Sequence, residues 1–231
     1  NLRVLDAGGL RATLLIESHG ALLLSLWNMN AGHEMGSRSP VPLFSLEVEK
    51  SGTPETALLS ADTGWTLVQH ELSTAGVLTL AFEASEPGQA QVHVELKARA
   101  DRGGIHWTFV AVPASSEWSV TRADFPKLAV AAPGNEPALF VPNFSGQVIR
   151  TAWSQPYVFV APYPGWNLAM PYVAAYDRDN HNGLYMAIHD AAGSVRTIAI
   201  QSRSESFDVL VENRIPAPDA GRAGNSFILS G

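Results

Sequence analysis

The sequence of 231 residues contains no cysteine, which excludes disulfide frameworks and thiolate-bound metals and leaves the redox compartment open. Its longest apolar run, residues 21–27, is interrupted by Ser25 and is far shorter than the roughly 20 residues needed to cross a bilayer. The formal net charge is −7, and no run of Lys or Arg occurs. The sequence therefore predicts neither a membrane partner nor a nucleic-acid partner.

Helical patterns and cofactor motifs are also missing. No long segment repeats its apolar residues every 3.6 positions between capping residues, so we expect very little helix. No P-loop, dinucleotide fingerprint or nucleophile elbow occurs, and no cofactor is expected. The chain begins with Asn1 instead of Met, so we expect an N-terminus made by processing or by design of the chain. We favour an extracellular or periplasmic protein, of bacterial type, over a cytoplasmic one.

What the sequence has in abundance is alternation of apolar and polar residues between turns. Residues 78–82, 92–97 and 105–112 alternate with period two, and turn residues at 17–20 and 101–104 predict hairpins. Further strands are predicted at residues 138–141, 157–161, 172–176, 184–189, 197–201 and 207–213. The 19 Gly and 15 Pro lie mainly between such segments. We predict an all-β, large two-sheet antiparallel β-sandwich in which residues 1–231 form a single domain.

Acidic residues offer pairs for glycoside hydrolysis, in which one carboxyl protonates the leaving oxygen and the other attacks or activates water. The candidates are Asp177, Asp179, Asp190, Glu205, Asp208 and Glu212. The stretch DRDNHNG at residues 177–183 also offers weak metal ligands in Asp177, Asp179 and Asn182. It departs from the EF-hand pattern, and Asp, Asn and Gly are typical of a hairpin tip. The turn interpretation is favoured, and no metal site is predicted.

Histidines give no stronger signal. None of the seven forms a ligand pair at helical spacing, although His93 and His106 are predicted on neighbouring strands with Glu95 between them. Polar residues on the wet face of an antiparallel strand are the simpler explanation.

Aromatic residues are the best indication of a ligand. Trp153, Tyr157, Tyr163, Trp166 and Tyr172 fall close together beside several prolines, and flat rings on rigid turns can stack on sugars. The alternative is that these rings fill a core or an interface between domains. For Trp107 and Phe109, which alternate inward on a strand, we predict the core.

From Thr121 onward, the sequence resembles the N-terminal β-supersandwich, or galactose-mutarotase-like, domain of DUF6259-type glycoside-hydrolase-like proteins. The resemblance depends on DFPKL at 124–128, LFVPNFSG at 139–146, MPYVAAYD at 170–177 and GLYMAIHD at 183–190. It implies a supersandwich followed by a TIM-like barrel that carries the catalytic carboxylates. The expected barrel is absent from this chain, so the resemblance implies a non-catalytic accessory domain of a carbohydrate-active enzyme.

Two alternatives stay open. The chain could be a free-standing carbohydrate-binding module that docks through Trp166 and neighbouring tyrosines. It could also be a mutarotase-like epimerase or lyase in which His189 and Asp190 perform acid–base chemistry. In each case the expected partner is an oligo- or polysaccharide, and only the accessory-domain interpretation requires the downstream barrel.

Overall fold

The computed structural model describes residues 1–84, 90–168, 170–180, 182–189, 195–203, 208–216 and 225–230. These residues form twenty β-strands and contain no helix, so the all-β prediction is confirmed. None of them belongs to a helix long and apolar enough to span a membrane.

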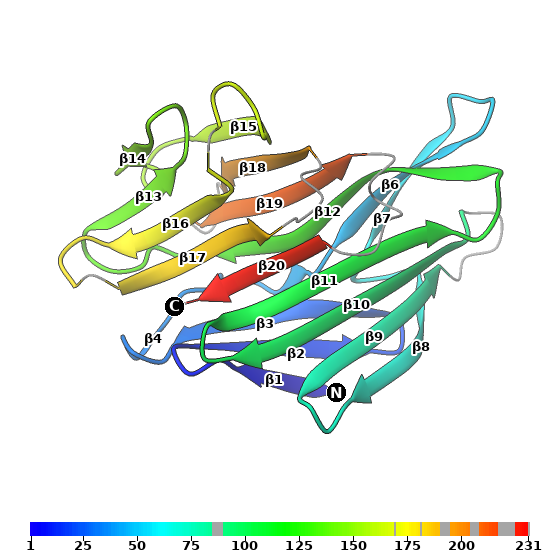
Figure 1. Cartoon of the computed structure of the whole chain (residues 1–231), viewed down its shortest axis with the longest axis horizontal. Coiled ribbons are helices and arrows are strands. Elements are labelled where there is room, and N and C mark those ends of the chain that lie inside the picture. The colour runs from blue at the N-terminus through cyan, green and yellow to red at the C-terminus, as the bar shows by residue number, and fades with distance from the viewer. Residues whose placement is uncertain are drawn as a thin grey trace.

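The strands form three sheets, of nine, six and five strands, in which the described neighbours pair antiparallel. The nine-stranded sheet has the order β14 (Gln147–Ile149), β13 (Pro137–Val141), β16 (Tyr172–Asp177), β17 (Asn182–His189), β20 (Asn225–Ser230), β11 (Gly104–Pro113), β10 (Val92–Asp101), β9 (Val77–Ala84) and β8 (Trp65–Leu72) (Figure 1). The six-stranded sheet has the order β15 (Val158–Tyr163), β18 (Arg196–Ser202), β19 (Val209–Pro216), β12 (Trp118–Val130), β6 (Ser45–Lys50) and β7 (Thr56–Ser60). The five-stranded sheet contains β1 (Leu2–Asp6), β2 (Leu10–Glu17), β3 (Gly20–Asn28), β4 (His33–Glu34) and β5 (Val41–Pro42).

One core lies between the sheets. Trp107 and Phe109 of β11 are 2% and 0% exposed, as predicted, and both contact Phe125 of β12. Phe109 and Phe125 are stacked with ring centroids 4.7 Å apart. Complete burial of a large apolar side chain contributes about 1.5–3 kcal/mol, so contacts of this kind hold the nine-stranded sheet against the six-stranded sheet. We call the face of each sheet that is turned away from this core its outer face.

Strand β20 joins two halves of the nine-stranded sheet. Its Leu229 is opposite Met186 of β17 on one side and opposite Ile105 of β11 on the other. The hairpins on either side, β16–β17 and β10–β11, are local in sequence, whereas the pairing with β20 is not. The outer face is therefore continuous from β14 to β8 only because β20 lies in the middle.

Candidate functional site

Aromatic rings gather on the outer face of the nine-stranded sheet, where β13, β16 and β17 lie side by side. Phe140 stacks on Tyr172 with ring centroids 5.2 Å apart and an interplanar angle of 14°. Tyr172 contacts Tyr185 at 5.1 Å with a tilt of 38°. The residues between them along each strand point into the core, so the three half-buried rings form one continuous aromatic cluster on the outer face. We call Phe140, Tyr172 and Tyr185 the aromatic platform.

Small residues make room for these rings. Ala174 of β16 lies between Phe140 and Tyr185 in the strand register, and Ala187 of β17 lies opposite Tyr172. Ala187 faces outward and is nevertheless only 2% exposed, because larger side chains surround it. Burial raises the pKa of Tyr185, and the neighbouring Tyr172 raises it further. The Tyr185 hydroxyl therefore keeps its proton at neutral pH and can donate a hydrogen bond to a ligand.

Polar groups occupy the same face beyond β20. The register runs from Tyr172 through Ala187 and β20 to His106 of β11, two strand spacings or roughly 10 Å from Ala187. His106 Nε2 lies 3.2 Å from Asp101 Oδ1, and Arg99 Nη2 lies 3.1 Å from Asp101 Oδ2. The backbone N–H of Gly103 is the main cause that lowers the pKa of Asp101, followed by His106 and Arg99.

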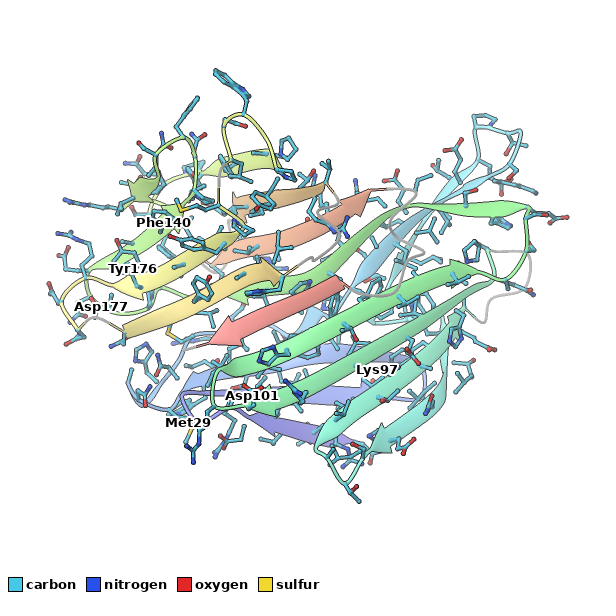
Figure 2. All side chains as sticks on the ribbon, viewed as in Figure 1. Met29, Lys97, Asp101, Phe140, Tyr176 and Asp177 are labelled. Carbon is cyan, nitrogen blue, oxygen red and sulfur yellow. The ribbon has the colours of Figure 1, made fainter. Side chains whose placement is uncertain are left out.

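Figure 2 shows how these groups are distributed: Phe140 and Tyr176 lie over β13 and β16, whereas Asp101 and Lys97 lie on the other half of the same sheet. The aromatic rings and the hydrogen-bonding groups thus occupy different halves of the outer face of the nine-stranded sheet. Ligand sites in proteins commonly combine apolar walls with a few polar groups that fix orientation.

A second pair of rings stands on loops that adjoin the platform. Phe144 lies in the loop after β13 and Trp166 in the loop after β15, with ring centroids 5.4 Å apart and ring planes at 90°. The two side chains are 54% and 90% exposed. The Phe144 N–H donates a 2.7 Å hydrogen bond to the Asn167 carbonyl oxygen, so the two loops are bound to each other. We call Phe144 and Trp166 the loop pair.

Gly146 connects the loop pair with the platform. A Cβ atom at this position would come within 2.8 Å of Cε2 of Phe140, and the backbone φ is +98°. The loop after β13 therefore lies against the Phe140 ring, and only glycine fits there without displacing it.

The structure brings two of the five predicted ligand-binding aromatics, Tyr172 and Trp166, to this surface. Trp153 is 6% exposed, and its indole Nε1–H donates a 2.9 Å hydrogen bond to the Val130 carbonyl oxygen. Tyr157 and Tyr163 pack against the core at the two ends of β15, and burial raises the pKa of Tyr157. A separate pocket of about 270 Å³ lies beside Trp153, Pro156 and Arg203.

The weak metal candidates lie at the turn between β16 and β17, whereas the catalytic candidate His189 lies on the same face as the platform, two residues after Ala187. His189 is the exposed last residue of β17, and Asp190 lies outside the described residues. Asp177 is 1% exposed and accepts hydrogen bonds from the Asn180 side chain at 2.6 Å and the Asp179 N–H at 3.1 Å. The Asn180 contact is the main cause that lowers the pKa of Asp177.

These contacts are those of a hairpin turn between β16 and β17, in which Asp177 is opposite Asn182. Among the described residues, no three His, Asp or Glu side chains are grouped in a way that could hold a metal ion. His93 and His106 do lie on neighbouring strands, but His93 is opposite Val112 whereas His106 is opposite Arg99. The register therefore separates the two histidines.

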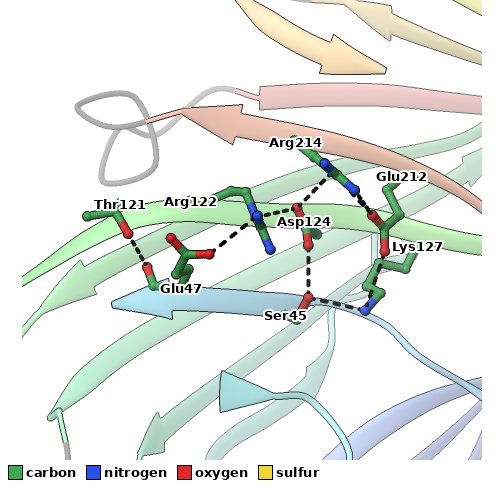
Figure 3. A network of polar contacts seen from close by, with 8 residues as sticks. All are labelled: Ser45, Glu47, Thr121, Arg122, Asp124, Lys127, Glu212 and Arg214. Carbon is green, nitrogen blue, oxygen red and sulfur yellow. Dashed lines mark hydrogen bonds and ion pairs between the residues drawn. The ribbon is translucent and has the colours of Figure 1, made fainter. Parts of the chain in front are cut away.

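A network of charges lies on the outer face of the six-stranded sheet, and Glu212 is its one member among the carboxylates considered from the sequence (Figure 3). Asp124 of β12 lies 3.2 Å from Arg122 and 3.9 Å from Arg214 and accepts a 3.2 Å hydrogen bond from the Ser45 hydroxyl. Burial raises the pKa of Asp124, and the nearby Glu212 raises it further.

The rest of the network balances these charges. Glu212 pairs with Arg214 at 3.2 Å and with Lys127 at 3.6 Å, and Arg122 reaches Glu47 at 3.3 Å. Three cations thus face three carboxylates. The Asp124 and Glu212 side chains are only 5% and 10% exposed, so these two carboxyls are largely shielded from solvent, whereas Glu47 is 40% exposed.

No family model matches the sequence, and no curated protein sequence matches it. Solved structures do. The Slr1438 protein from Synechocystis sp. PCC 6803 has a TM-score of 0.59 and 10% identity, and the alignment covers 100% of this chain and 96% of that one. A galactose mutarotase related enzyme from Lactobacillus acidophilus has a TM-score of 0.57 and 10% identity, with 100% and 98% covered. The α-N-acetylgalactosaminidase NagBb from Bifidobacterium bifidum has a TM-score of 0.65 and 13% identity, with 98% of this chain but 36% of that chain covered.

These similarities show the fold, which is the galactose mutarotase-like all-β fold. The chain spans nearly the whole length of the free-standing neighbours and just over a third of the glycosidase. The all-β, sandwich-like prediction and the resemblance to the galactose-mutarotase-like fold are confirmed at this level, whereas the strands form three sheets instead of the predicted two.

Phe140, Tyr185 and Phe144 belong to the surface, although sequence reasoning did not propose them as ligand contacts. The alternation of β13 and β17 placed Phe140 and Tyr185 opposite their core-facing neighbours, which was the available signal. Their proximity to Tyr172 depends on strand pairing, and no single segment contains it.

Proposed function

We propose that this chain is a non-catalytic, carbohydrate-binding accessory domain of a glycan-active enzyme, and that the aromatic platform is its sugar contact. The observation that carries the proposal is the continuous contact of Phe140, Tyr172 and Tyr185 on the outer face of the nine-stranded sheet. A pyranose ring has an apolar C–H face that stacks on aromatic rings and hydroxyls that need hydrogen-bonding partners. The Tyr185 hydroxyl and the more distant His106 and Asp101 offer such partners on the same face.

The finer proposal is that the domain acts beside a TIM-like catalytic barrel in a DUF6259-type protein. It is supported by the sequence resemblance from Thr121 onward and by the glycosidase neighbour, of which the alignment covers 36%. We further propose that the chain works in the periplasm or outside the cell.

Direct titration tests the proposal. Because neighbours include an α-N-acetylgalactosaminidase and a galactose mutarotase related enzyme, galactose and its oligosaccharides are the first probes, followed by malto-oligosaccharides. Truncation of a central aromatic contact commonly costs more than about 1.4 kcal/mol, so Tyr172→Ala should weaken binding at least about tenfold. Trp27→Ala removes a 39%-exposed ring from the five-stranded sheet and should change nothing. Equal effects of the two substitutions would contradict the assignment of the platform.

One observation favours a second candidate function, that of a mutarotase-like epimerase. His106 is hydrogen-bonded to Asp101 on the same face as the platform, which is the arrangement of an oriented general base. The test is the rate at which the chain accelerates mutarotation of α-galactose, measured by polarimetry. Acceleration lost in His106→Gln and kept in Trp27→Ala would favour the epimerase over the accessory domain. Acceleration lost in His189→Gln instead would favour the pair predicted from sequence.

A further inference from the structure

The loop pair exposes an unusual amount of aromatic surface. Trp166 is 90% exposed and Phe144 54% exposed, and the two rings meet edge to face. Phe144 also has φ +53°, in the left-handed region that residues other than glycine rarely adopt. A strained backbone that presents an exposed ring is typical of a functional position, because folding alone does not reward either feature.

The exposed rings are nevertheless held in place. Leu168 is fully buried, and its N–H donates a 3.2 Å hydrogen bond to the Gly165 carbonyl oxygen, so the Trp166 loop is anchored in the core two residues from its tip. The Phe144 N–H is bonded to the Asn167 carbonyl oxygen at 2.7 Å. A contact that is ordered before binding loses less conformational entropy when a ligand arrives. The loop pair is therefore preorganised for binding.

The loop pair and the platform are parts of one surface. Gly146 lies against the Phe140 ring two residues after Phe144, so the loop that carries Phe144 borders the platform directly. The platform already has three rings in sequence with centroid spacings of 5.1 and 5.2 Å. A single sugar ring is too small to contact all three rings of the platform and also the loop pair that borders them.

We infer that the surface takes an oligosaccharide, with one sugar unit on the platform and a following unit against the loop pair. The inference depends on the proposed function and adds the ligand class and a specificity contact, in which Phe144 and Trp166 together select for chain length. When several sugar units each contact an aromatic ring, affinity rises with the length of the oligosaccharide. Successive bases of single-stranded nucleic acids that stack on aromatic side chains behave in the same way.

The experiment is a calorimetric titration of two series, galactose to stachyose through melibiose and raffinose, and glucose to maltohexaose. For the native chain, affinity should rise at least about tenfold from the monosaccharide to the tetrasaccharide in the series that binds. Trp166→Ala should remove this rise and leave the monosaccharide affinity unchanged. Phe144→Gly should do the same, since glycine keeps the left-handed backbone and removes only the ring. Tyr172→Ala should weaken every length.

Several results would overturn the inference. Binding that is independent of length in the native chain would contradict it and leave the proposed function intact. Equal loss for all lengths in Trp166→Ala would place the loop pair at the first sugar instead of the second. Self-association that disappears in Trp166→Ala, without a change in length dependence, would make the pair a protein contact. Failure of both series to bind at all would reject the proposed function together with the inference.

Discussion

At the scale of single residues, Gly146 has the most demanding position on the candidate surface. Its φ of +98° and its proximity to the Phe140 ring are two separate reasons for glycine. Gly32 offers a matched comparison, because its φ is +68° and a Cβ atom there would meet nothing within 4 Å.

We predict that Gly146→Ala lowers the free energy of unfolding by about 1–3 kcal/mol more than Gly32→Ala does, because overpacking against Phe140 adds to the backbone strain. Urea unfolding of the two variants measures the difference. The near-ultraviolet circular dichroism of Gly146→Ala should change as well, since Phe140 and Tyr172 would no longer stack. Equal losses in the two variants would show that the contact with Phe140 has no energetic weight.

Asp124 gives a prediction on pH. Its pKa is raised in the folded chain, so between the ordinary value of 3.8 and the raised value the folded state binds more protons than the unfolded state. The free energy of unfolding of the native chain should therefore rise, relative to that of Asp124→Asn, as the pH falls through this window. Urea unfolding of both chains from pH 7 downward measures the difference.

Asp101 is the control for Asp124, because its pKa is lowered. Its contribution to stability is present above pH 3.8 and is lost as the pH falls, relative to Asp101→Asn. For each aspartate, the measured quantity is the difference in unfolding free energy between the native chain and the Asn variant. If this difference changed with pH in the same direction for both aspartates, it would contradict the different environments that the structure gives them.

At the scale of the elements, a polar contact links the five-stranded sheet to the edge of the nine-stranded sheet. Arg3 of β1 donates a 2.8 Å hydrogen bond from Nε to Nε2 of His70 on β8. Burial is the main cause that lowers the pKa of His70, and Arg3 and the N-terminal amine lower it further. The histidine must be neutral to accept this hydrogen bond.

We predict that the contact stabilises the chain above about pH 6.5 and that its contribution is lost as the pH falls through the lowered pKa of His70. The measurement is the free energy of unfolding of the native chain and of His70→Gln from pH 8 to pH 5, with the gap between them closing at low pH. In an Arg3→Gln background the pH dependence should become smaller without vanishing, because burial alone still lowers the pKa. An unchanged dependence in that background would mean that Arg3 has no influence on His70.

Element by element, the sequence predicted short alternating strands well and long or polar ones poorly. The strands predicted at 138–141, 172–176 and 197–201 are present with slightly wider bounds. Strand β12, whose outward residues include Arg122, Asp124 and Lys127, was not predicted, because a register shift between Asp124 and Lys127 interrupts its alternation. Those charges are tolerated because Glu47 and Glu212, from β6 and β19, neutralise them. Local alternation contains no information on such partners.

At the scale of the whole molecule, the fold class was predictable and the site was predictable only in part. The chain has enough alternation and turns to indicate a sandwich, and the structural neighbours confirm that class. The aromatic count pointed to Tyr172 and Trp166, but also to Trp153, whose side chain is buried. Trp153 and Trp166 both lie in loops, and whether such a loop packs inward or outward depends on pairings between segments that are distant in the sequence.

The position of β20 between β17 and β11 leads to a prediction for the whole sheet. Leu229→Pro should lower the free energy of unfolding by about 2 kcal/mol or more, because proline in a central strand removes a ladder hydrogen bond and leaves an acceptor unpaired. Val4→Pro, on the edge strand β1, should cost less. Urea unfolding compares the two, and a greater loss for Val4→Pro would show that β20 does not hold the sheet together.

The same position has a consequence for how the chain folds. Before β20 arrives, the β10–β11 and β16–β17 hairpins can each form locally, and each then has an open strand edge on the side that faces the other. Such edges pair readily with strands of other molecules. Refolding yield should therefore fall steeply with protein concentration, since the slow closure of a long loop competes with capture by a neighbouring chain. The strand that makes the outer face of the nine-stranded sheet continuous also determines how long the incompletely folded chain exposes edges that can aggregate.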